Sequence, residues 1–469
     1  MYFSANACWE VVTASLYQAI LAGGPTVLVW SYLLCAVGAT CIACAFAEFA
    51  SIWPTAGGQY HWAVHLAPAR YKRQVGWFTA WLLLSRFTLA LVGQIYTVVQ
   101  SVQSMIIISI TTYEAARWHS YLMFIAVLLL SGGVNIFVPR AIHHISIVGL
   151  VFHILGYFAL SISLLATTKE FNSAKLVFGS ILDSTGYNNK GVAFLIGMLP
   201  AANTFITIDG PAHYAEETSK PRTDVSRAIS WGTALSSLIG LPYAIILGFT
   251  MGDPVALLTS PVNNLNPLAQ VVLNNTGSRG AAIALSLPLL VVAFATTIES
   301  LGMVARIIMA QARDKAVPYS KFLCKIHHRH NSPANAVVVT MVLQIALAAI
   351  YVGNTTAFYG LTSSSVILQV ISLLIPVTFH LLYRKKFKLS YGPWQVHRMV
   401  RPLVNIAGFV VFALIFVAML LPTMKPVTAA NMNYACVMLG AVLILIPAYW
   451  VVWGRKRYNG PLYMFSMSD

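Results

Sequence analysis

Charged side chains are scarce in this 469-residue sequence, in which Asp, Glu, Lys and Arg together make up 9% of the residues. A soluble domain averages about 25% charged residues, so this chain cannot cover itself with a water-facing surface. Hydrophobic residues account for 58% of the chain, and its mean hydropathy is +0.73. The composition excludes a soluble globular protein and predicts an integral membrane protein.

Motifs for catalysis and for metal or cofactor binding are also missing. The sequence has no Ser–His–Asp order, no Walker loop and no GxGxxG fingerprint. Its six cysteines lie mostly in apolar stretches, and Cys41 and Cys44 share a helix face without the remaining ligands of a metal site. We therefore predict that the protein is not an enzyme, and that it has neither a cofactor nor a metal site.

Long apolar stretches recur along the chain, many of them near the roughly 20 residues that one membrane-spanning helix needs. A shorter apolar segment, 7–22, comes first and carries Glu10. After it the sequence predicts eleven spanning helices, at 27–46, 75–99, 121–137, 145–167, 191–208 with a short continuation, 228–251, 281–303, 334–352, 358–380, 403–421 and 433–453. The predicted fold class is an all-α membrane protein with about 11 full transmembrane helices and a partial first helix.

Basic residues outnumber acidic ones, with 29 Lys and Arg against 13 Asp and Glu. With the amino end of the short first segment placed inside, 22 of the basic residues fall in connections that face the cytoplasm and 6 in connections that face outward. This asymmetry follows the positive-inside rule. The basic excess therefore encodes topology, and we predict a lipid bilayer rather than nucleic acid as the partner.

A group of short motifs resembles one family of transporters. The stretch 47–62, AEFASIWPTAGGQYHW, is similar to a signature of the fungal amino acid/choline permeases, which belong to the amino acid–polyamine–organocation superfamily. Further matches to that family's pattern, in chain order, are Trp9-Glu10, Gly23-Gly24-Pro25, Asp209-Gly210 with His213 and Glu216-Glu217, and Ala312-Arg313-Asp314 with Pro318. The matches run from about residue 8 to about residue 335.

The resemblance implies a 5+5 inverted-repeat fold followed by two extra helices. In this sequence 8–167 would form the first repeat, 191–380 the second, and 403–453 the two additional helices, all within a single transmembrane domain over 1–469. It also implies secondary transport of amino acids, γ-aminobutyrate, choline or polyamines, often with protons. We expect the plasma membrane as its location, with a vacuolar or other internal membrane as the alternative.

The sequence Ile208-Asp209-Gly210-Pro211 interrupts the apolar run that begins at 191. At membrane depth a broken helix is tolerated only where it packs against protein or lines a cavity, and transporters use such breaks as binding sites. Carbonyl groups of the outer half and N–H groups of the inner half would suit a zwitterion. We predict a substrate site formed by Phe205, Thr207, Ile208, Asp209 and Gly210.

Ionisable residues near this break have open interpretations. Asp209 either caps the inner half-helix or serves as a cation or proton partner. Glu216 and Glu217 are expected at the cytoplasmic boundary, paired with Lys220, Arg222 or Arg227 in a structural or gating role. Arg86 lies inside a span, and we predict that it faces Glu299 or Glu10, because opposite charges at depth offset one another.

Coupling and gating are assigned to four residues. Glu10 is expected beside the site in a structural or coupling role, and Glu216 at the cytoplasmic edge. Gly57 and Gly58 permit a tight bend and close packing after the second span, which suits a cytoplasmic gate; a plain helix-ending turn is the alternative.

The start of the chain affects the functional prediction. The family resemblance implies a first helix with an inner half and a break that contacts substrate, yet only Met1–Ala7 precede the Cys8-Trp9-Glu10 stretch. We therefore expect the inner half to be absent and transport to be reduced or lost. Two functions remain. One is a secondary permease, which would draw its energy from ion gradients because the sequence shows no ATP-binding domain. The other is a non-transporting, permease-like sensor or partner.

Overall fold

The computed structural model of the protein describes residues 7–110, 112–205, 207–262, 265–327, 332–387, 391–429 and 431–461. Within these ranges the chain is helical, with one isolated β-bridge between His327 and Ser332. The predicted all-α class is therefore confirmed.

The helices follow one another closely along the chain. The first group comprises α2 (Cys8–Ala14), α3 (Leu16–Ile52), α4 (Gln59–Leu66), the 3₁₀ turn η1 (Ala69–Tyr71), α5 (Lys72–Ser109), α6 (Arg117–Phe137), α7 (Ala141–Thr167) and α8 (Ala174–Phe178). The second group comprises α9 (Lys190–Asn203), the 3₁₀ helix η2 (Gly210–Glu217), α10 (Pro221–Thr250), α11 (Pro254–Leu258), α12 (Pro267–Thr276), α13 (Arg279–Arg313), α14 (Ser320–Leu323), α15 (Ala334–Gly353) and α16 (Thr355–Phe387). The chain then continues through α17 (Arg401–Met419), α18 (Ala435–Tyr449), the π-helical turn η3 (Trp450–Gly454) and α19 (Arg455–Arg457).

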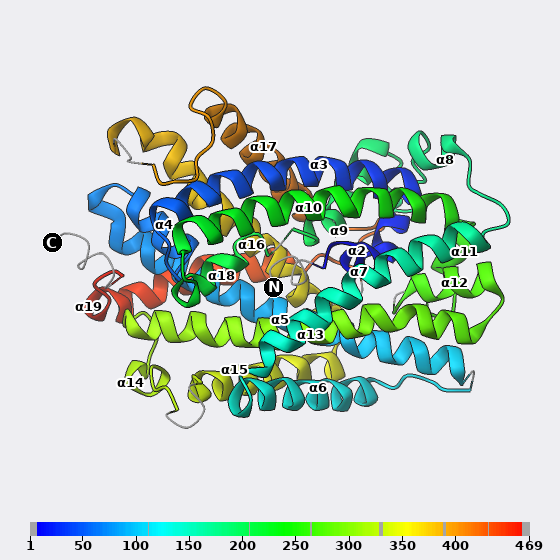
Figure 1. Ribbon diagram of the computed structural model, residues 1–469, viewed down its shortest axis with the longest axis horizontal. Helices are drawn as coiled ribbons and strands as arrows, with labels where there is room; N and C mark the ends of the chain where they lie inside the picture. The colour runs from blue at the N-terminus through cyan, green and yellow to red at the C-terminus, as the bar shows by residue number, and fades with distance from the viewer. Residues whose placement is uncertain are drawn as a thin grey trace.

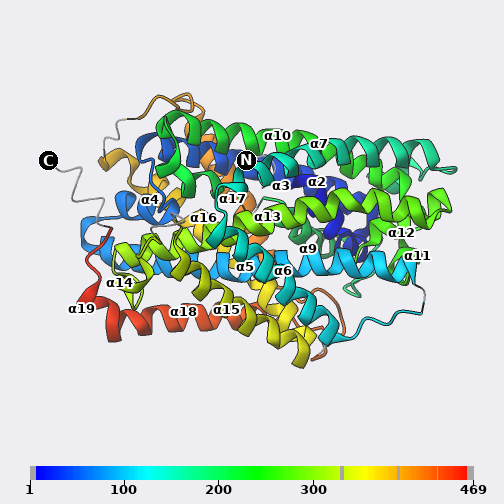
Figure 2. The same cartoon turned by 60° about the horizontal axis from the view of Figure 1, so that its bottom comes forward.

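The long helices form a bundle whose axes run along the long dimension of the molecule, as the two views in Figures 1 and 2 both show. The short elements α8, α11 and α12 gather at one end, and α4, α14 and α19 gather at the other (Figure 1). The latter end carries the basic residues around Arg70–Arg73, Arg313–Lys315 and Arg455–Arg457. The positive-inside rule predicts that this end faces the cytoplasm.

Ten helices in the described ranges are long and apolar enough to cross a membrane: α3, α5 with η1, α6, α7, α10, α13, α15, α16, α17 and α18 with its continuation to Arg457. They coincide with ten of the eleven predicted spans. The remaining prediction, 191–208, falls on α9, which has only 14 residues. The sequence-based count therefore included as one full span a helix that the structure breaks.

The short first segment, 7–22, forms α2 and the beginning of α3. The helical path of α3 is interrupted at Gly23 and Gly24, where Gly24 has a φ of 71°. Such a conformation favours glycine, and a Cβ at Gly24 would also lie 3.0 Å from the side chain of Leu182. Residues 1–6 lie outside the described ranges, so the prediction about the inner half of this helix stays a prediction.

Apolar side chains cover both the interior and the outer faces of the bundle. The interior holds two packed clusters, one centred on α3, α9 and α10 and another on α5, α13 and α15. Outside, large apolar residues such as Leu155 and Ile162 on α7 and Val452 after α18 are 62%, 62% and 74% exposed. Exposed apolar faces of this extent mark surfaces that meet lipid or another apolar partner.

Candidate functional site

The predicted helix break is present in the structure and begins earlier than the sequence suggested. Helix α9 contains Pro200, which has no N–H to donate to the preceding turn. The helix ends at Asn203, and the described residues 204–205 and 207–209 form turns before η2 begins at Gly210. Pro211 occupies the first turn of η2, where a missing N–H costs nothing.

Asp209 lies at the N-cap position of η2, but its side chain does not cap that helix. Its Oδ2 instead accepts a hydrogen bond from Arg86 Nη2 on α5 and lies 3.2 Å from His213 Nε2. Asp209 is fully buried, and Arg86 and His213 are each 2% exposed. Of the two interpretations of Asp209, the geometry favours the charge partner over the cap.

The aromatic ring of Phe87 completes this cluster. The guanidinium carbon of Arg86 lies 3.5 Å from the centre of the Phe87 ring, a cation–π arrangement. The imidazole of His213 meets the same ring edge-on, with 5.2 Å between centroids. The charges of the cluster are therefore enclosed by protein on several sides.

The prediction that Arg86 pairs with Glu299 or Glu10 was wrong. Arg86 forms its ion pair with Asp209 and not with Glu299 or Glu10. Glu299 accepts a hydrogen bond from Ser146 on α7, and Glu10 Oε1 lies 2.7 Å from His153 Nδ1. Arg86 does meet an opposite charge, as expected for a buried charged side chain. The packing of α5 against the broken helix decides which carboxylate that is.

A cavity of about 590 Å³ lies beside the break. Its walls come from α2, the beginning of α3, α5, α9, α13 and α16, together with residues between α17 and α18. The lining is mixed: apolar side chains alternate with hydroxyl and amide groups, among them those of Ser15, Gln94, Thr97, Asn203, Thr204, Thr207, Thr296, Thr362 and Ser365. A volume and lining of this kind suit a small polar molecule.

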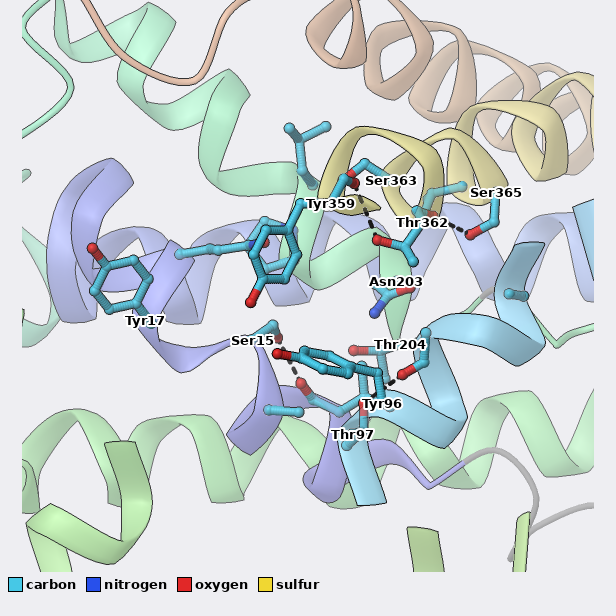
Figure 3. Close-up of a pocket in the computed structure, with 18 of the residues that line it drawn as sticks. Ser15, Tyr17, Tyr96, Thr97, Asn203, Thr204, Tyr359, Thr362, Ser363 and Ser365 are labelled. Atoms are coloured by element: carbon cyan, nitrogen blue, oxygen red, sulfur yellow. Dashed lines mark hydrogen bonds between the residues drawn. The ribbon is translucent and has the colours of Figure 1, made fainter. Parts of the chain in front are cut away.

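Aromatic rings line one part of this cavity. Tyr96 on α5 packs against Phe358 and Tyr359 at centroid distances of 5.1 and 6.1 Å. Figure 3 shows the side chains of Tyr96 and Tyr359 around the same space as Ser15 and Asn203. Neither tyrosine was singled out from the sequence, because an aromatic residue in an apolar helix carries no local sign of its role.

The residues predicted to bind substrate lie close together, but they differ in their access to the cavity. Thr207 lines it, as does Glu10. Phe205 and Ile208 are fully buried, and Phe205 packs on Tyr32 at 5.6 Å between centroids. Asp209 is occupied by its ion pair, and Gly210 begins η2.

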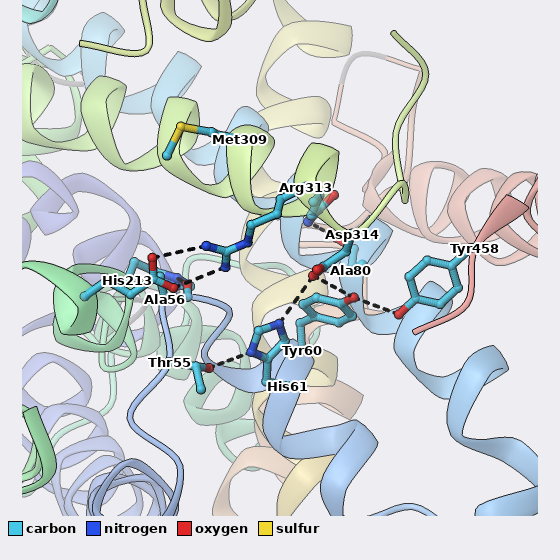
Figure 4. Close-up of polar contacts among 12 residues, drawn as sticks. Thr55, Ala56, Tyr60, His61, Ala80, His213, Met309, Arg313, Asp314 and Tyr458 are labelled. Carbon is cyan, nitrogen blue, oxygen red and sulfur yellow. Dashed lines mark hydrogen bonds and ion pairs between the residues drawn. The ribbon is translucent and has the colours of Figure 1, made fainter. Parts of the chain in front are cut away.

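The predicted gating glycines lie in the connection between α3 and α4. This connection is held from two sides: His213 Nδ1 donates to the Ala56 carbonyl oxygen over 2.8 Å, and His61 Nδ1 lies 2.8 Å from Thr55 Oγ1 (Figure 4). Gly58 has a φ of 52°, and a Cβ there would lie 3.1 Å from His213 Cε1. The turn therefore depends on glycine, and it touches the residue that also contacts Asp209.

A second buried polar cluster lies at the end of the bundle that carries α4, α14 and α19. Asp314, which follows α13, accepts a hydrogen bond from Tyr60 over 3.1 Å and lies 3.5 Å from His61 Nε2. The hydroxyl of Tyr60 is also 2.8 Å from that of Tyr458 near the C-terminus. Burial raises the pKa of Tyr60 well above its usual value, so its hydroxyl stays protonated and available as a donor.

The acidic pair after the break reaches different partners from those predicted. Glu216 pairs with Arg313 at 3.2 Å and Glu217 with Arg306 at 2.7 Å, rather than with Lys220, Arg222 or Arg227. These carboxylates are 46% and 57% exposed, and their position at the cytoplasmic boundary stays a prediction. Both pairs link η2 to the C-terminal part of α13.

Comparison with known proteins adds a family to this geometry. A family profile described as "Amino acid permease" matches residues 2–442. An amino-acid permease of Schizosaccharomyces pombe is 32% identical, covering 98% of this chain and 84% of its own length. A choline transporter of Saccharomyces cerevisiae is 28% identical, and the alignment covers 97% of this chain and 80% of the transporter's length. Amino-acid permease 2 of Neurospora crassa is also 28% identical, over 98% of this chain and 84% of the permease's length.

Proposed function

The chain belongs to the amino acid permease family, and on that basis we propose that it carries amino acids or related amines across a membrane by secondary active transport. Membership of a transporter family also means that it is not an enzyme. The protein moves its substrate by alternating access, with the cavity beside the helix break as the binding site. The plasma membrane is its proposed location.

The observation that carries this proposal is the cavity of about 590 Å³ next to a helix that is broken between Asn203 and Gly210. A helix broken at this depth leaves backbone groups that only a cavity or packed protein can satisfy. We assign Thr207 and the neighbouring backbone of Phe205, Ile208, Asp209 and Gly210 to the substrate site. Thr207 is the member of this set that lines the cavity.

An inverted-repeat architecture accounts for the way in which the helices pack. Residues 8–167 form the first repeat and 191–380 the second, with 403–453 as two additional helices. In support of this, helices at corresponding positions pack against each other: α2 with α9, α3 with α10, α5 with α13, and α6 with α15. Rocking of one repeat against the other would alternate access to a site between them.

The gate on the cytoplasmic side is formed by the turn at Gly57 and Gly58 and by the ion pair of Glu216. The cavity reaches the connection between α17 and α18, in which Thr423 and Met424 line it. Lys425 in the same connection donates its backbone N–H to the Thr185 carbonyl near α8, at the outer end. In this proposal the site opens toward that end, and the Asp209 cluster lies on its other side.

Protons are the proposed coupling ion, and His213 supports this. A carbonyl oxygen only accepts, so the contact with Ala56 places a proton on His213 Nδ1. The Nε2 atom then lies 3.2 Å from the Asp209 carboxylate. This imidazole and carboxylate, side by side beside the helix break, form the proposed proton site.

Reconstituted transport tests the function. The purified full chain in proteoliposomes should accumulate at least one member of a radiolabelled panel of amino acids, γ-aminobutyrate, choline and polyamines. An inward proton gradient should raise the uptake, and His213→Gln should remove that stimulation. Binding of a panel member without uptake in any gradient would instead favour the non-transporting, sensor-like alternative.

A further inference from the structure

One carboxylate lines the cavity, and one of its two oxygen atoms has no hydrogen-bond partner among the described residues. Glu10 on α2 is 3% exposed and is among the lining residues. Its Oε1 is engaged by His153 Nδ1 at 2.7 Å, whereas its Oε2 has no hydrogen-bond partner among the described residues. A buried carboxylate oxygen without a partner is costly, and a ligand that supplies a donor or a positive charge would relieve that cost.

The rest of the lining offers no charge that could balance a negative group. Among the described residues around the cavity there is no lysine, arginine or histidine, and Glu10 is the one carboxylate. Arg86, the buried cation of the bundle, is paired with Asp209 and is not part of the lining. An acidic ligand would therefore meet only neutral dipoles and one like charge.

The aromatic rings add a second feature that favours a cation. Tyr96, Phe358 and Tyr359 all line the cavity and pack on one another. The faces of such rings attract ammonium groups, and sets of aromatic side chains recognise quaternary ammonium ligands. The cavity thus combines an acceptor of positive charge with rings that tolerate alkylated nitrogen.

We propose that the cavity binds a small organic cation carrying an ammonium group, with Glu10 as its counter-ion, in preference to a neutral or acidic amino acid. This inference rests on the proposed function, because it names the substrate class of the same site. His153 acts here as a positioning residue, because its Nδ1 holds Glu10 Oε1 at 2.7 Å and leaves Oε2 for the ligand. Trp9 fixes that histidine's backbone by donating its indole N–H to the His153 carbonyl over 3.0 Å.

The test uses binding rather than transport, so that it does not depend on the transport cycle. The purified full chain in detergent is titrated with choline and with 3,3-dimethyl-1-butanol, the neutral compound in which carbon replaces the quaternary nitrogen. Binding is read from the ligand-induced rise in melting temperature and from displacement of radiolabelled choline. We expect choline to bind at least tenfold more tightly than the alcohol, and glutamate not to compete.

The variants locate the charge. Glu10→Gln should weaken choline binding at least tenfold and leave the affinity for the alcohol unchanged, and Glu10→Asp should retain the preference for the cation. Glu170→Gln is the matched control, because Glu170 is exposed and does not line the cavity. Should Glu10→Gln fail to fold, the comparison of choline with its neutral analogue on the unmodified chain still decides the matter.

Two results would overturn the inference. Equal affinity of the wild type for choline and for the alcohol would mean that Glu10 does not attract the positive charge of the ligand. Tight binding of glutamate would exclude a cation site as well. Uptake of an acidic or neutral amino acid would refute this inference while supporting the transport function, whereas cation binding without uptake would do the reverse.

Discussion

The buried pair of Arg86 and Asp209 should make a large contribution to stability that depends on both members being present. Their side chains are 2% and 0% exposed. Removing one partner from a buried ion pair leaves an uncompensated charge and costs about 3–5 kcal/mol. Arg86→Met leaves Asp209 with His213 at 3.2 Å, so the loss of stability in this variant should lie near the lower end of that range. Asp209→Asn leaves the Arg86 guanidinium over the Phe87 ring without a carboxylate, and the loss of stability in this variant should lie near the upper end.

The double variant should be less destabilised than the sum of the two single variants, because it leaves neither charge behind. We expect a coupling energy of at least about 2 kcal/mol, within the range known for contacting residues. Reversible unfolding in mixed micelles with increasing SDS, followed by tryptophan fluorescence, measures all four proteins. Arg313→Met and Glu216→Gln serve as the control cycle, since that pair is 42% and 46% exposed and should couple by about 1 kcal/mol or less. Additive losses at Arg86 and Asp209 would refute the reasoning.

Three further predictions concern single positions. Gly240→Ala would place a Cβ 1.9 Å from the Tyr32 hydroxyl, which should lower stability by about 1–3 kcal/mol through overpacking, as the same SDS titration would detect. Gly58→Ala should cost about 1–3 kcal/mol because of the positive φ and should slow uptake, whereas a wild-type rate would argue against a moving turn. Burial, with smaller effects of His61 and Lys72, lowers the pKa of His65 from 6.5 to about 4. As the pH falls, His65 therefore takes up its proton in the unfolded chain before it does so in the folded protein. The stability should then fall by at most about 3 kcal/mol as the pH drops from 6.5 towards 4. Melting curves across that range should show a weaker pH dependence for His65→Phe than for the wild type.

The membrane-spanning helices could be predicted from sequence because length and hydropathy determine them locally. Ten predicted spans coincide with long apolar helices. The break was also visible, since Asp-Gly-Pro in an apolar run cannot continue a helix without loss. Its start at Thr204 was missed, because the residues from 204 to 207 contain neither proline nor glycine.

Side-chain partners across the bundle could not be predicted in the same way. The sequence placed Arg86 and Glu216 among charges but gave them the wrong partners. Arg86 lies 123 positions from Asp209, and Glu216 lies 97 positions from Arg313. Only the packing of α5 and α13 against the broken helix brings these groups together. The cavity is likewise a product of packing, because its aromatic and hydroxyl residues are ordinary members of apolar helices.

The most direct test of the central claim compares uptake by the wild type with uptake by a chain whose cavity is filled. Ala14 lines the cavity and is exposed, so Ala14→Trp should occupy the space without displacing packed neighbours. Ala174→Trp, at an exposed position of α8 outside the lining, is the matched control. In proteoliposomes assayed with a radiolabelled member of the panel that the wild type accumulates, the account predicts equal uptake by the wild type and the control and loss of uptake in the filled variant. Equal uptake by all three proteins would contradict it.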